Sequence, residues 1–575
     1  MTSRSLRRLA VPAWSALLAV AILGPALGRG HVLAYDMVST PRPPLGWRAA
    51  GLGDALPRAV PQDLVVALLA RVVPGSLVQA AALVGAVFFA AWGAGLLVPT
   101  RRTGLRLAAA SLYGWNAFVA ERLFLGHWGL LLAYAALPWV VRAALGVHTG
   151  RWGAERVVLA AAPAALTPTG SLLALAAAAA VLLAPGGARR RHGWWAVAGT
   201  AALTLPWLVA GLASPAGART DPAGVDVFSV RSEGPGGLLG TVAGLGGIWN
   251  AAVVPASRTT VAALAGTVLV LALVVAGLRV LRGRWPGGTA TGLAVLAGAG
   301  VLVAVAGAVP GLREVVRLLV ATVPGGGLVR DGQKFLAPLA LLFAVAAPLG
   351  VERVVVLLRR RVPPGAGTRV AAGVLVAGAV VFPVAVLPDL AWGGLGRLAA
   401  VRYPADWAAV ADRVDGRGGT LVTLPFGAHR AYGWNGGRTS LDPADRYLDV
   451  PVVVDDALVV AGADGRPVVV GGEDPRAAQV RGVVGRGAPL TGVGVRWALV
   501  ETDQPGPVPP GALTGMRPVW TGKTLTLYEA TVPVAAPADP SAARRVAVSL
   551  GHLGLLATLV VALLVRVTTV TGGRC

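Results

Sequence analysis

The chain has 575 residues, of which 55% are hydrophobic and only 14% are charged, and its mean hydropathy is +0.68. A water-soluble globule of this size cannot cover so much apolar surface, so the composition excludes a disordered or ordinary soluble protein and predicts a polytopic membrane protein. The formal net charge of +24 would favour nucleic-acid binding in a soluble chain, but here the cations lie in short loops between apolar runs and set topology. We expect no nucleic-acid partner.

A membrane-spanning helix needs about 20 apolar residues. About twelve segments approach that requirement, although several are short: 9 to 28, 77 to 98, 105 to 120, 129 to 145, 156 to 167, 170 to 185, 194 to 213, 259 to 279, 287 to 309, 335 to 358, 367 to 388 and 547 to 566. The motif Thr167-Pro168-Thr169-Gly170 is either a turn between the fifth and sixth segments or a break inside one long helix. We favour the turn, because it keeps the next basic loop on the same side as the others.

The basic residues predict the orientation of these segments. The first segment follows Arg4, Arg7 and Arg8, which suits either a secretory signal or an anchor, and the many spans that follow favour an uncleaved anchor. If that end is cytoplasmic, the arginine-rich loops at 101–106, 142–156, 189–191, 279–284 and 359–361 are cytoplasmic too. Of the 27 acids, only Glu155 and Glu352 then lie inside. We therefore expect a multi-pass protein of the cytoplasmic (inner) membrane with both termini in the cytoplasm.

The pattern divides the chain into three parts. Residues 1–388 form the transmembrane domain, residues 389–545 a soluble extracytoplasmic domain, and residues 546–575 a final transmembrane helix with a cytoplasmic tail. The soluble part contains 16 of the 27 acids. A helix is predicted from Tyr403 to Val414, and strands are predicted at 419–425, 467–470, 495–501 and 524–529. The expected fold class is an α-helical polytopic membrane protein with a C-terminal α/β domain.

The first polar loop carries a candidate catalytic acid. It begins at His31 and places Asp36 a few residues beyond the end of the first helix. A carboxylate near the membrane surface lies in a lower dielectric than bulk water, which can raise its basicity and suits a general base. The alternative is that Asp36 is a solvated loop acid without a chemical role.

The second polar loop, residues 113–128, combines aromatic and polar groups in a segment that is otherwise apolar enough to insert. Its polar side chains cannot all face lipid cheaply, so they are candidate substrate-binding groups: Asn116, Glu121, Arg122 and His127. The alternative is an interfacial ion pair within a belt of tryptophan side chains.

The third candidate is a pair of cations near residue 330. The apolar stripe of Leu312 to Val323 predicts a helix lying on the membrane surface, and the motif Arg330-Asp331-Gly332-Gln333-Lys334-Phe335 follows it. Arg330 and Lys334 stand at the mouth of the next helix, where they could clamp a lipid-linked phosphate. The alternative is that both extend to lipid headgroups.

Familiar cofactor motifs are missing from the sequence. It contains no HExxH motif, no Walker-type phosphate loop and no dinucleotide fingerprint. Asp455 and Asp456 are adjacent, and adjacent residues on a strand point to opposite faces, which disfavours a metal site there. The residues therefore assign no cofactor.

Four segments resemble those of actinobacterial membrane proteins related to arabinofuranosyltransferases, which are GT-C-type glycosyltransferases: 34–38, 116–122, 166–170 and 330–335. The resemblance covers residues 1–388 and, more loosely, the soluble domain. It implies a lipid bilayer environment, a polyprenyl-phosphate sugar as donor and a cell-envelope glycan or lipid as acceptor outside the cytoplasmic membrane. Asp36 would correspond to the catalytic acid of the family's first loop. Tyr35 and Met37 replace the usual paired acidic motif, which leaves a divalent cation open as a cofactor.

This resemblance implies inverting transfer, with Asp36 as the base, with Arg330, Lys334 and Arg122 on the phosphate, and with Glu121 or His127 orienting the acceptor sugar. Two other functions fit many spans with polar loops. A transporter or flippase would place ionisable groups near the bilayer midplane, where this chain has almost no acids. A non-catalytic membrane protein would bind envelope glycans without turnover.

Overall fold

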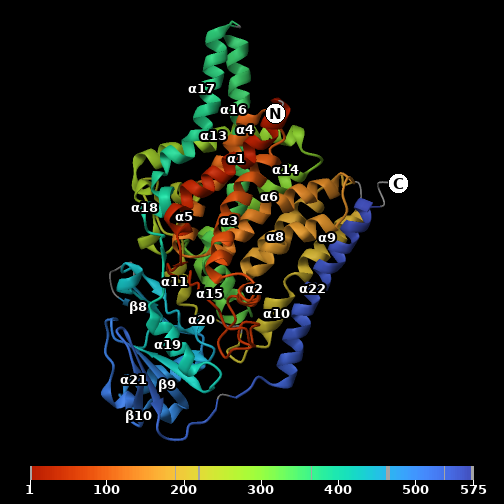
Figure 1. The fold of residues 1–575 in the computed structure, drawn as a ribbon. Helices are drawn as coiled ribbons and strands as arrows, with labels where there is room; N and C mark the ends of the chain where they lie inside the picture. The colour runs from red at the N-terminus through yellow and green to blue at the C-terminus, as the bar shows by residue number, and fades with distance from the viewer. Residues whose placement is uncertain are drawn as a thin grey trace.

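The computed structural model describes residues 3–187, 190–217, 220–363, 365–461, 467–536 and 538–571. Arg189 of the predicted third basic loop and residues 572–575 of the predicted tail lie outside the described residues. A helical region occupies the upper part of Figure 1, an α/β domain lies below it, and the closing helix α22 runs along one side of the helical region. The chain is a multi-pass membrane protein with a partly β-sheet C-terminal region.

Within the described ranges, eight helices are long and apolar enough to cross a membrane. They are α1 (Ser3–Leu23), α3 (Gly75–Leu97), α6 (Trp128–His148), α13 (Val261–Arg284), α14 (Thr289–Ala306), α16 (Ala337–Arg361), α17 (Ala366–Val386) and α22 (Ala542–Thr571). A ninth span results if α9 (Arg190–Ala202) and α10 (Leu205–Leu212), which are bent by 47° at their junction, cross together. The predicted count of about twelve is not confirmed.

The difference in span count arises from helices too short to cross a bilayer alone. The predicted span at 105–120 is interrupted at Trp115 and Asn116, and the predicted pair around Thr167 forms one short helical turn and one 15-residue helix. Thr167 has extended backbone angles, and its side chain accepts a hydrogen bond from the Gly170 amide at 3.2 Å, which starts the second helix. These elements are α4 (Thr103–Gly114), α5 (Ala117–Phe124), α7 (Glu155–Ala161) and α8 (Pro168–Leu182).

Small residues bring the two most closely packed spans together. A Cβ atom at Gly277 of α13 would lie 1.9 Å from the Ala346 carbonyl oxygen of α16, and one at Gly350 of α16 would lie 2.0 Å from the Leu273 carbonyl oxygen. Neither position therefore accepts a larger side chain without moving a helix. Close backbone approach through small residues is how membrane helices gain packing energy without a hydrophobic driving force.

The α/β domain is built on a five-stranded sheet of order β10-β11-β9-β3-β6. Strands β9, β10 and β11 are antiparallel, whereas β3 runs parallel to both β9 and β6. The bounds are β3 (Thr420–Leu424), β6 (Val452–Val453), β9 (Val495–Glu501), β10 (Met516–Thr521) and β11 (Leu525–Ala530). The helices α19 (Ala405–Val414) and α21 (Pro475–Gly485) contribute to two separate apolar cores. The helix and strands predicted in this region are confirmed, but β10 and α21 were not predicted.

Short elements join the domain to the helical region. Strand β1 (His31–Val32), which follows the first span, pairs with β2 (Ala400–Val401), and β4 (His429–Arg430) pairs with β5 (Ser440–Leu441). A separate hairpin is formed by β7 (Leu458–Ala461) and β8 (Pro467–Val470). The remaining helices are α2 (Gln62–Leu69), α11 (Gly224–Phe228), α12 (Gly237–Ala243), α15 (Leu312–Thr322), α18 (Ala391–Leu395) and α20 (Ala444–Tyr447), of which α15 matches the helix predicted at Leu312 to Val323.

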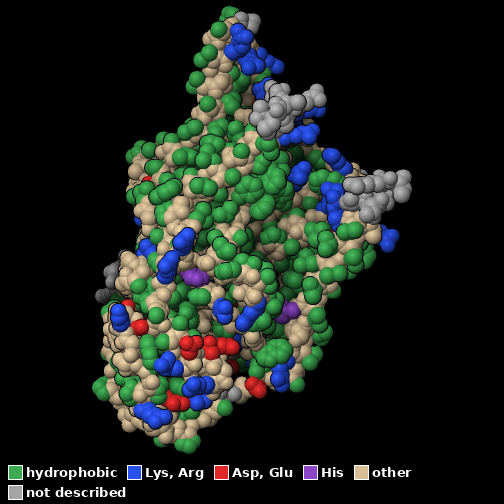
Figure 2. All heavy atoms as spheres, in the orientation of Figure 1, with side chains coloured by type: hydrophobic (Ala, Val, Ile, Leu, Met, Phe, Trp, Pro, Cys, Tyr) green, Lys and Arg blue, Asp and Glu red, His purple; other side chains and the backbone are tan. Residues whose placement is uncertain are grey.

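Charge is distributed unevenly over the molecule. On the face shown in Figure 2, acidic side chains gather in the lower part, over the α/β domain and the loops that meet it, whereas the upper part shows arginines among apolar side chains. This distribution agrees with the sequence, in which most acids follow residue 388.

Candidate functional site

A tight turn places Asp36 where the helical region meets the α/β domain. Ala34 and Met37 exchange two backbone hydrogen bonds, of 3.0 and 2.9 Å, so Tyr35 and Asp36 form the tip. Tyr35 has a φ of 46°, in the left-handed region that a non-glycine residue rarely adopts. Its amide donates to the Thr439 carbonyl at 2.7 Å, and its carbonyl accepts from the Leu441 amide at 2.8 Å. The α/β domain therefore holds the strained turn from both sides.

The second polar loop supports the same turn from the helical region. The Asp36 amide donates to the Leu125 carbonyl at 3.1 Å. Gly126, with a φ of 86°, packs so closely that a Cβ atom there would lie 2.3 Å from the Met37 amide nitrogen and 2.5 Å from the Ala34 carbonyl oxygen. Only glycine satisfies both the positive φ and the close approach.

The side chain of Asp36 is 48% exposed and contacts His127, the residue before α6, through Oδ2 and Nε2 at 3.0 Å. Burial by the surrounding chain would raise the pKa of Asp36, but the hydrogen bond from His127 and the charge of Lys334 counter it and the pKa is lowered. Asp36 is therefore a carboxylate at neutral pH. Among the described residues, its Oδ1 atom has no hydrogen-bond partner and is free to accept a proton.

The tautomer of His127 follows from its other contact. The Nδ1 atom lies 3.0 Å from an Arg122 Nη1 atom, and a guanidinium can only donate, so Nδ1 accepts. The proton of the neutral ring then resides on Nε2 and points at Asp36. Burial, with the charges of Arg122 and Lys334, lowers the pKa of His127 despite the nearby Asp36. His127 is a neutral imidazole that donates to the carboxylate.

Arg122 lies beneath His127 with no exposed surface. It forms a bidentate pair with Asp331, with distances of 2.6 and 2.7 Å, and its Nε donates to Gln333 Oε1 at 2.6 Å. Burial alone would raise the pKa of Asp331, but the charges of Arg122 and Lys334 lower it. The residues form a continuous relay from solvent to the interior: Asp36, His127, Arg122 and Asp331.

Lys334 completes the arrangement. Its Nζ atom lies 3.4 Å from Asp331 Oδ2, and its side chain is 24% exposed. Its charge reaches Asp36 strongly enough to contribute to the lowered pKa of that carboxyl. In the part of the chain that the structure describes, Lys334 has no second partner, so two of its three N–H groups are available for another acceptor. We call Asp36, His127, Arg122, Asp331 and Lys334 the Asp36 site.

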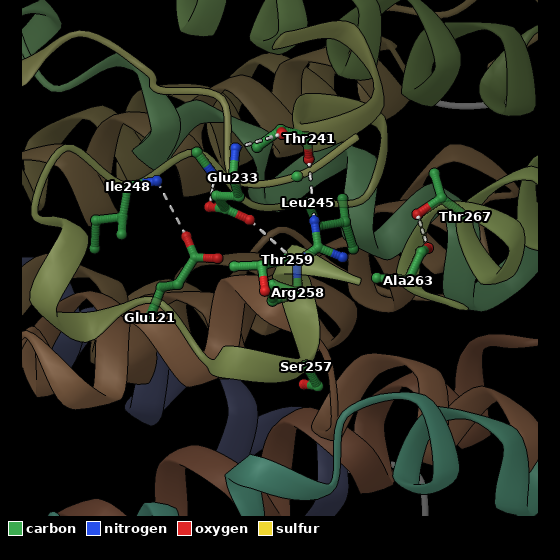
Figure 3. Close-up of polar contacts among 12 residues, drawn as sticks. Glu121, Glu233, Thr241, Leu245, Ile248, Ser257, Arg258, Thr259, Ala263 and Thr267 are labelled. Atoms are coloured by element: carbon green, nitrogen blue, oxygen red, sulfur yellow. Dashed lines mark hydrogen bonds and ion pairs between the residues drawn. The ribbon is translucent and has the colours of Figure 1, made fainter. Parts of the chain in front are cut away.

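Glu121 is fully buried, and in Figure 3 its carboxylate points toward the Ile248 amide. One of its carboxylate oxygens accepts hydrogen bonds from the Ile248 amide and from Gln333 Nε2, both at 3.1 Å. Burial and the neighbouring charge of Glu233, which pairs with Arg258 at 3.1 Å, raise the pKa of Glu121 well above its usual value. Glu121 therefore holds the segment around Ile248 against α5. Its own carboxylate does not reach solvent.

The two remaining predicted residues also have structural partners. Asn116 caps α5 by accepting from the Val119 amide at 3.0 Å. Arg330 pairs with Glu473 of the α/β domain at 3.2 Å, and its guanidinium stacks 4.7 Å above the Phe228 ring. The structure thus brings together four of the predicted residues: Asp36, His127, Arg122 and Lys334. Glu121 joins them through Gln333. The other two, Asn116 and Arg330, contact different partners.

Sequence reasoning missed the partners that organise the site. Asp331 and Gln333 were recognised as parts of a motif but not as partners of Arg122, and Gly126 and His429 were not singled out. One signal was available. An arginine inside an apolar segment requires an acidic partner, and Asp331 stands at the start of another apolar segment, which makes it a candidate for that partner.

The described residues do not fit a metal site. No group of three or more His, Cys, Asp or Glu side chains is placed within them to hold a metal ion. The side chains around Asp36 are His127, which donates a hydrogen bond to it, and several cations. Cations repel a metal ion and do not ligate it. The divalent cation left open by the sequence therefore has no place in the chemistry derived below.

No protein-family model matches the chain, and no curated protein matches it. Solved structures do match: cryo-EM structures of arabinofuranosyltransferase AftD from Mycobacteria and of two classes of a mutant of it, with TM-scores of 0.58, 0.54 and 0.51. The identities are 18%, 18% and 17%, over 92%, 93% and 92% of this chain. The chain therefore shares its fold with this part of AftD. The match covers only 40% to 42% of the AftD chain, so this chain spans about two fifths of the length of AftD.

Proposed function

We propose that the chain is a membrane glycosyltransferase that moves a sugar from a polyprenyl-phosphate donor to a cell-envelope glycan or lipid on the outer face of the cytoplasmic membrane. The observation that carries the proposal is an exposed carboxylate held on a buried relay, beside a lysine with free donors, within a fold shared with AftD. Because AftD is an arabinofuranosyltransferase, arabinofuranose is the sugar to test first.

Asp36 is the general base of the proposed reaction. His127 occupies Oδ2, so Oδ1 accepts the proton of the acceptor hydroxyl. The hydroxyl oxygen forms a bond to the anomeric carbon of the donor from the face opposite the phosphate. The bond between that carbon and the phosphate oxygen breaks, and its electrons leave with the polyprenyl phosphate. Transfer therefore inverts the anomeric configuration.

Lys334 is the proposed contact for the leaving phosphate. It stands at the start of the span that begins at Gly332, at the level where a lipid-linked phosphate would lie, and it is partly exposed. Its positive charge stabilises the phosphate most as negative charge develops on departure. Arg330 would assist only after leaving Glu473.

The buried residues act on Asp36 and not on the substrate. Arg122 has no exposed surface, and it fixes the His127 ring through Nδ1. Glu121 holds Gln333, which in turn holds Arg122. We therefore propose positioning roles for Glu121, Arg122, His127 and Asn116, in place of the substrate contacts predicted from the sequence.

The orientation in the membrane is part of the proposal. On the face shown in Figure 2, Lys and Arg side chains lie at the upper end of the helical region as well as over the α/β domain, whereas acidic side chains gather in the lower part, over the α/β domain. This distribution supports a cytoplasmic position for the termini and an extracytoplasmic position for Asp36. A protease added outside intact cells should cleave within residues 389–545.

Turnover by the purified protein tests the proposal directly. The chain, reconstituted in lipid, would be incubated with labelled polyprenyl-phosphate arabinofuranose and a synthetic arabinofuranosyl oligosaccharide. Polyprenyl phosphate should be released in proportion to a product one sugar longer. Binding of the oligosaccharide without release, across a panel of polyprenyl-phosphate sugars, would instead indicate a non-catalytic glycan-binding protein.

A further inference from the structure

The α/β domain reaches the Asp36 site through a small hairpin. In this hairpin, His429 of β4 pairs with Leu441 of β5, and Arg430 pairs with Ser440. Ser440 also forms a parallel bridge with Tyr35, the residue before Asp36. The turn that carries Asp36, β5 and β4 therefore lie side by side as three adjacent segments. Neighbouring strands are about 4.8 Å apart, so β4 lies roughly 10 Å from that turn.

Arg430 fixes the direction in which β4 faces. Its side chain is 4% exposed and pairs with Glu501 and, at 2.9 Å, with Asp442. It also donates to Thr423 Oγ1 at 3.1 Å and to the Gly427 carbonyl at 2.8 Å. Arg430 therefore points into the α/β domain. Because successive residues of a strand point to opposite faces, His429 points away from that interior, and it is exposed.

His429 and Asp36 interact electrostatically across the boundary between the two regions. Burial lowers the pKa of His429 although the charge of Asp36 raises it, so the ring is neutral near pH 7; a proton on the ring would lower the pKa of Asp36 in return. The other ionisable groups near this point are His127 and Lys334 in the helical region, Arg430 on the same strand, and Arg58, which pairs with Glu473 at 2.8 Å. Asp36 thus has Lys334 of a membrane helix and His429 of the soluble domain as its partly exposed neighbours.

These two neighbours suit different substrates. A polyprenyl phosphate arrives from the bilayer, so its phosphate comes to the membrane-helix side, where Lys334 offers a cation. The acceptor glycan is water-soluble and polyhydroxylated, so it approaches from the α/β-domain side. An imidazole both donates and accepts hydrogen bonds, as sugar hydroxyls do.

We propose that His429 binds the acceptor sugar over Asp36, so that the α/β domain forms the acceptor side of the site. The inference rests on the proposed function and adds to it the residue that selects the second substrate. His429 is a substrate-binding residue in this assignment, and Asp36 remains the base. Loss of one such hydrogen bond weakens binding by about tenfold.

The test compares His429→Ala with the intact chain in the transfer assay, with acceptor and donor varied separately. The KM for the arabinofuranosyl oligosaccharide should rise about tenfold, while kcat and the KM for the lipid donor stay within about twofold. His429→Gln, which keeps a donor and an acceptor, should recover most of the lost affinity. His192→Ala on α9, distant from the α/β domain, is the matched control and should behave as the intact chain.

Two outcomes would overturn the inference while leaving the proposed function in place. One is an unchanged acceptor KM in an active His429→Ala protein. The other is a fall in kcat without a change in KM, which would indicate that the substitution disturbs the Asp36 turn. Equilibrium binding of the oligosaccharide to both proteins provides a readout without turnover, and equal binding by the two would also contradict the inference.

Discussion

Among the described residues two arginines are buried, Arg122 and Arg430, and the charged clusters around them differ in one respect. In the helical region Arg122 faces one carboxylate, that of Asp331, and its remaining donors reach His127 and Gln333. In the α/β domain Arg430 faces two carboxylates, those of Asp442 and Glu501. From the first cluster, side-chain contacts lead through His127 and Asp36 to solvent. The contacts of the second cluster all lie within the α/β domain.

The electrostatic consequences of the two clusters are opposite. The pKa of Asp331 is lowered because Arg122 and Lys334 together outweigh the effect of burial. The pKa of Glu501 is raised well above its usual value, because burial and the neighbouring Asp442 outweigh the shared arginine. A cluster in which cations outnumber carboxylates can keep an exposed carboxylate ionised. A cluster in which carboxylates outnumber cations instead fixes a strand. If the chain acts as proposed, the first cluster serves the reaction and the second holds β4 in place.

Removing the two arginines should separate these roles. Arg122→Met leaves Asp331 buried without a partner and should destabilise the fold by about 3 to 5 kcal/mol, with loss of kcat. Arg430→Met should destabilise by a similar amount but raise the acceptor KM, since β4 loses its attachment. Thermal unfolding in detergent, followed by steady-state kinetics below the transition, measures both.

A double substitution sharpens this comparison. In Arg122→Met with Asp331→Leu neither member of the buried pair is left without its partner, and Lys334, which also loses Asp331, is partly exposed to water, so most of the stability should return. Activity should not return, because His127 still lacks the donor that fixes its tautomer. Recovery of both stability and kcat in the double variant would show that Arg122 serves the fold alone.

Gly126→Ala should act on Asp36 without touching any charge. The added methyl group collides with the Met37 amide and the Ala34 carbonyl, so the turn must shift. A displacement of about 1 Å typically costs about 100-fold in kcat. Gly311→Ala is the matched control, since Gly311 has a φ of 83° and no neighbour within 4 Å of the added atom. Equal kcat values for the two variants would count against the role of the turn.

His127→Phe should change the pH dependence of transfer. It removes the hydrogen bond that lowers the pKa of Asp36 and leaves the burial that raises it, so this pKa should rise. In the intact chain kcat/KM falls only as the pH drops through a value below 3.8, because the base must be ionised. In the variant the same fall should begin at higher pH. The control is His192→Phe. If kcat/KM of His127→Phe fell at the same acidic pH as that of the control, the assignment would be contradicted.

Parts of this arrangement could be predicted from the sequence. Periodicity and turn residues predicted α15, α19 and four strands of the α/β domain, and position after the first span singled out Asp36. The span count could not be obtained in this way, because hydropathy does not distinguish a lipid-facing helix from the short helices α4, α5, α7 and α8, which pack largely against protein. A strand of two residues such as β4 has no periodicity, so His429 gave no signal.

The partners within the site were also beyond sequence reasoning. Arg122 and Asp331 are 209 positions apart, and only the fold brings them within hydrogen-bond distance. Arg330 and Lys334 were expected to act together, but the 3₁₀ turn at Gly332–Leu336 directs them to different partners, Glu473 and Asp331.

Sugar transfer by Asp36→Asn, compared with Asp54→Asn in the same loop, tests the central claim most directly. The amide of the first variant cannot accept the hydroxyl proton, whereas Asp54 is an exposed acid outside the Asp36 site. Release of polyprenyl phosphate should fall by about 10²- to 10⁴-fold in Asp36→Asn, with unchanged thermal unfolding, and should be unaffected in Asp54→Asn. Equal release by the two variants would remove Asp36 from the reaction and contradict the account.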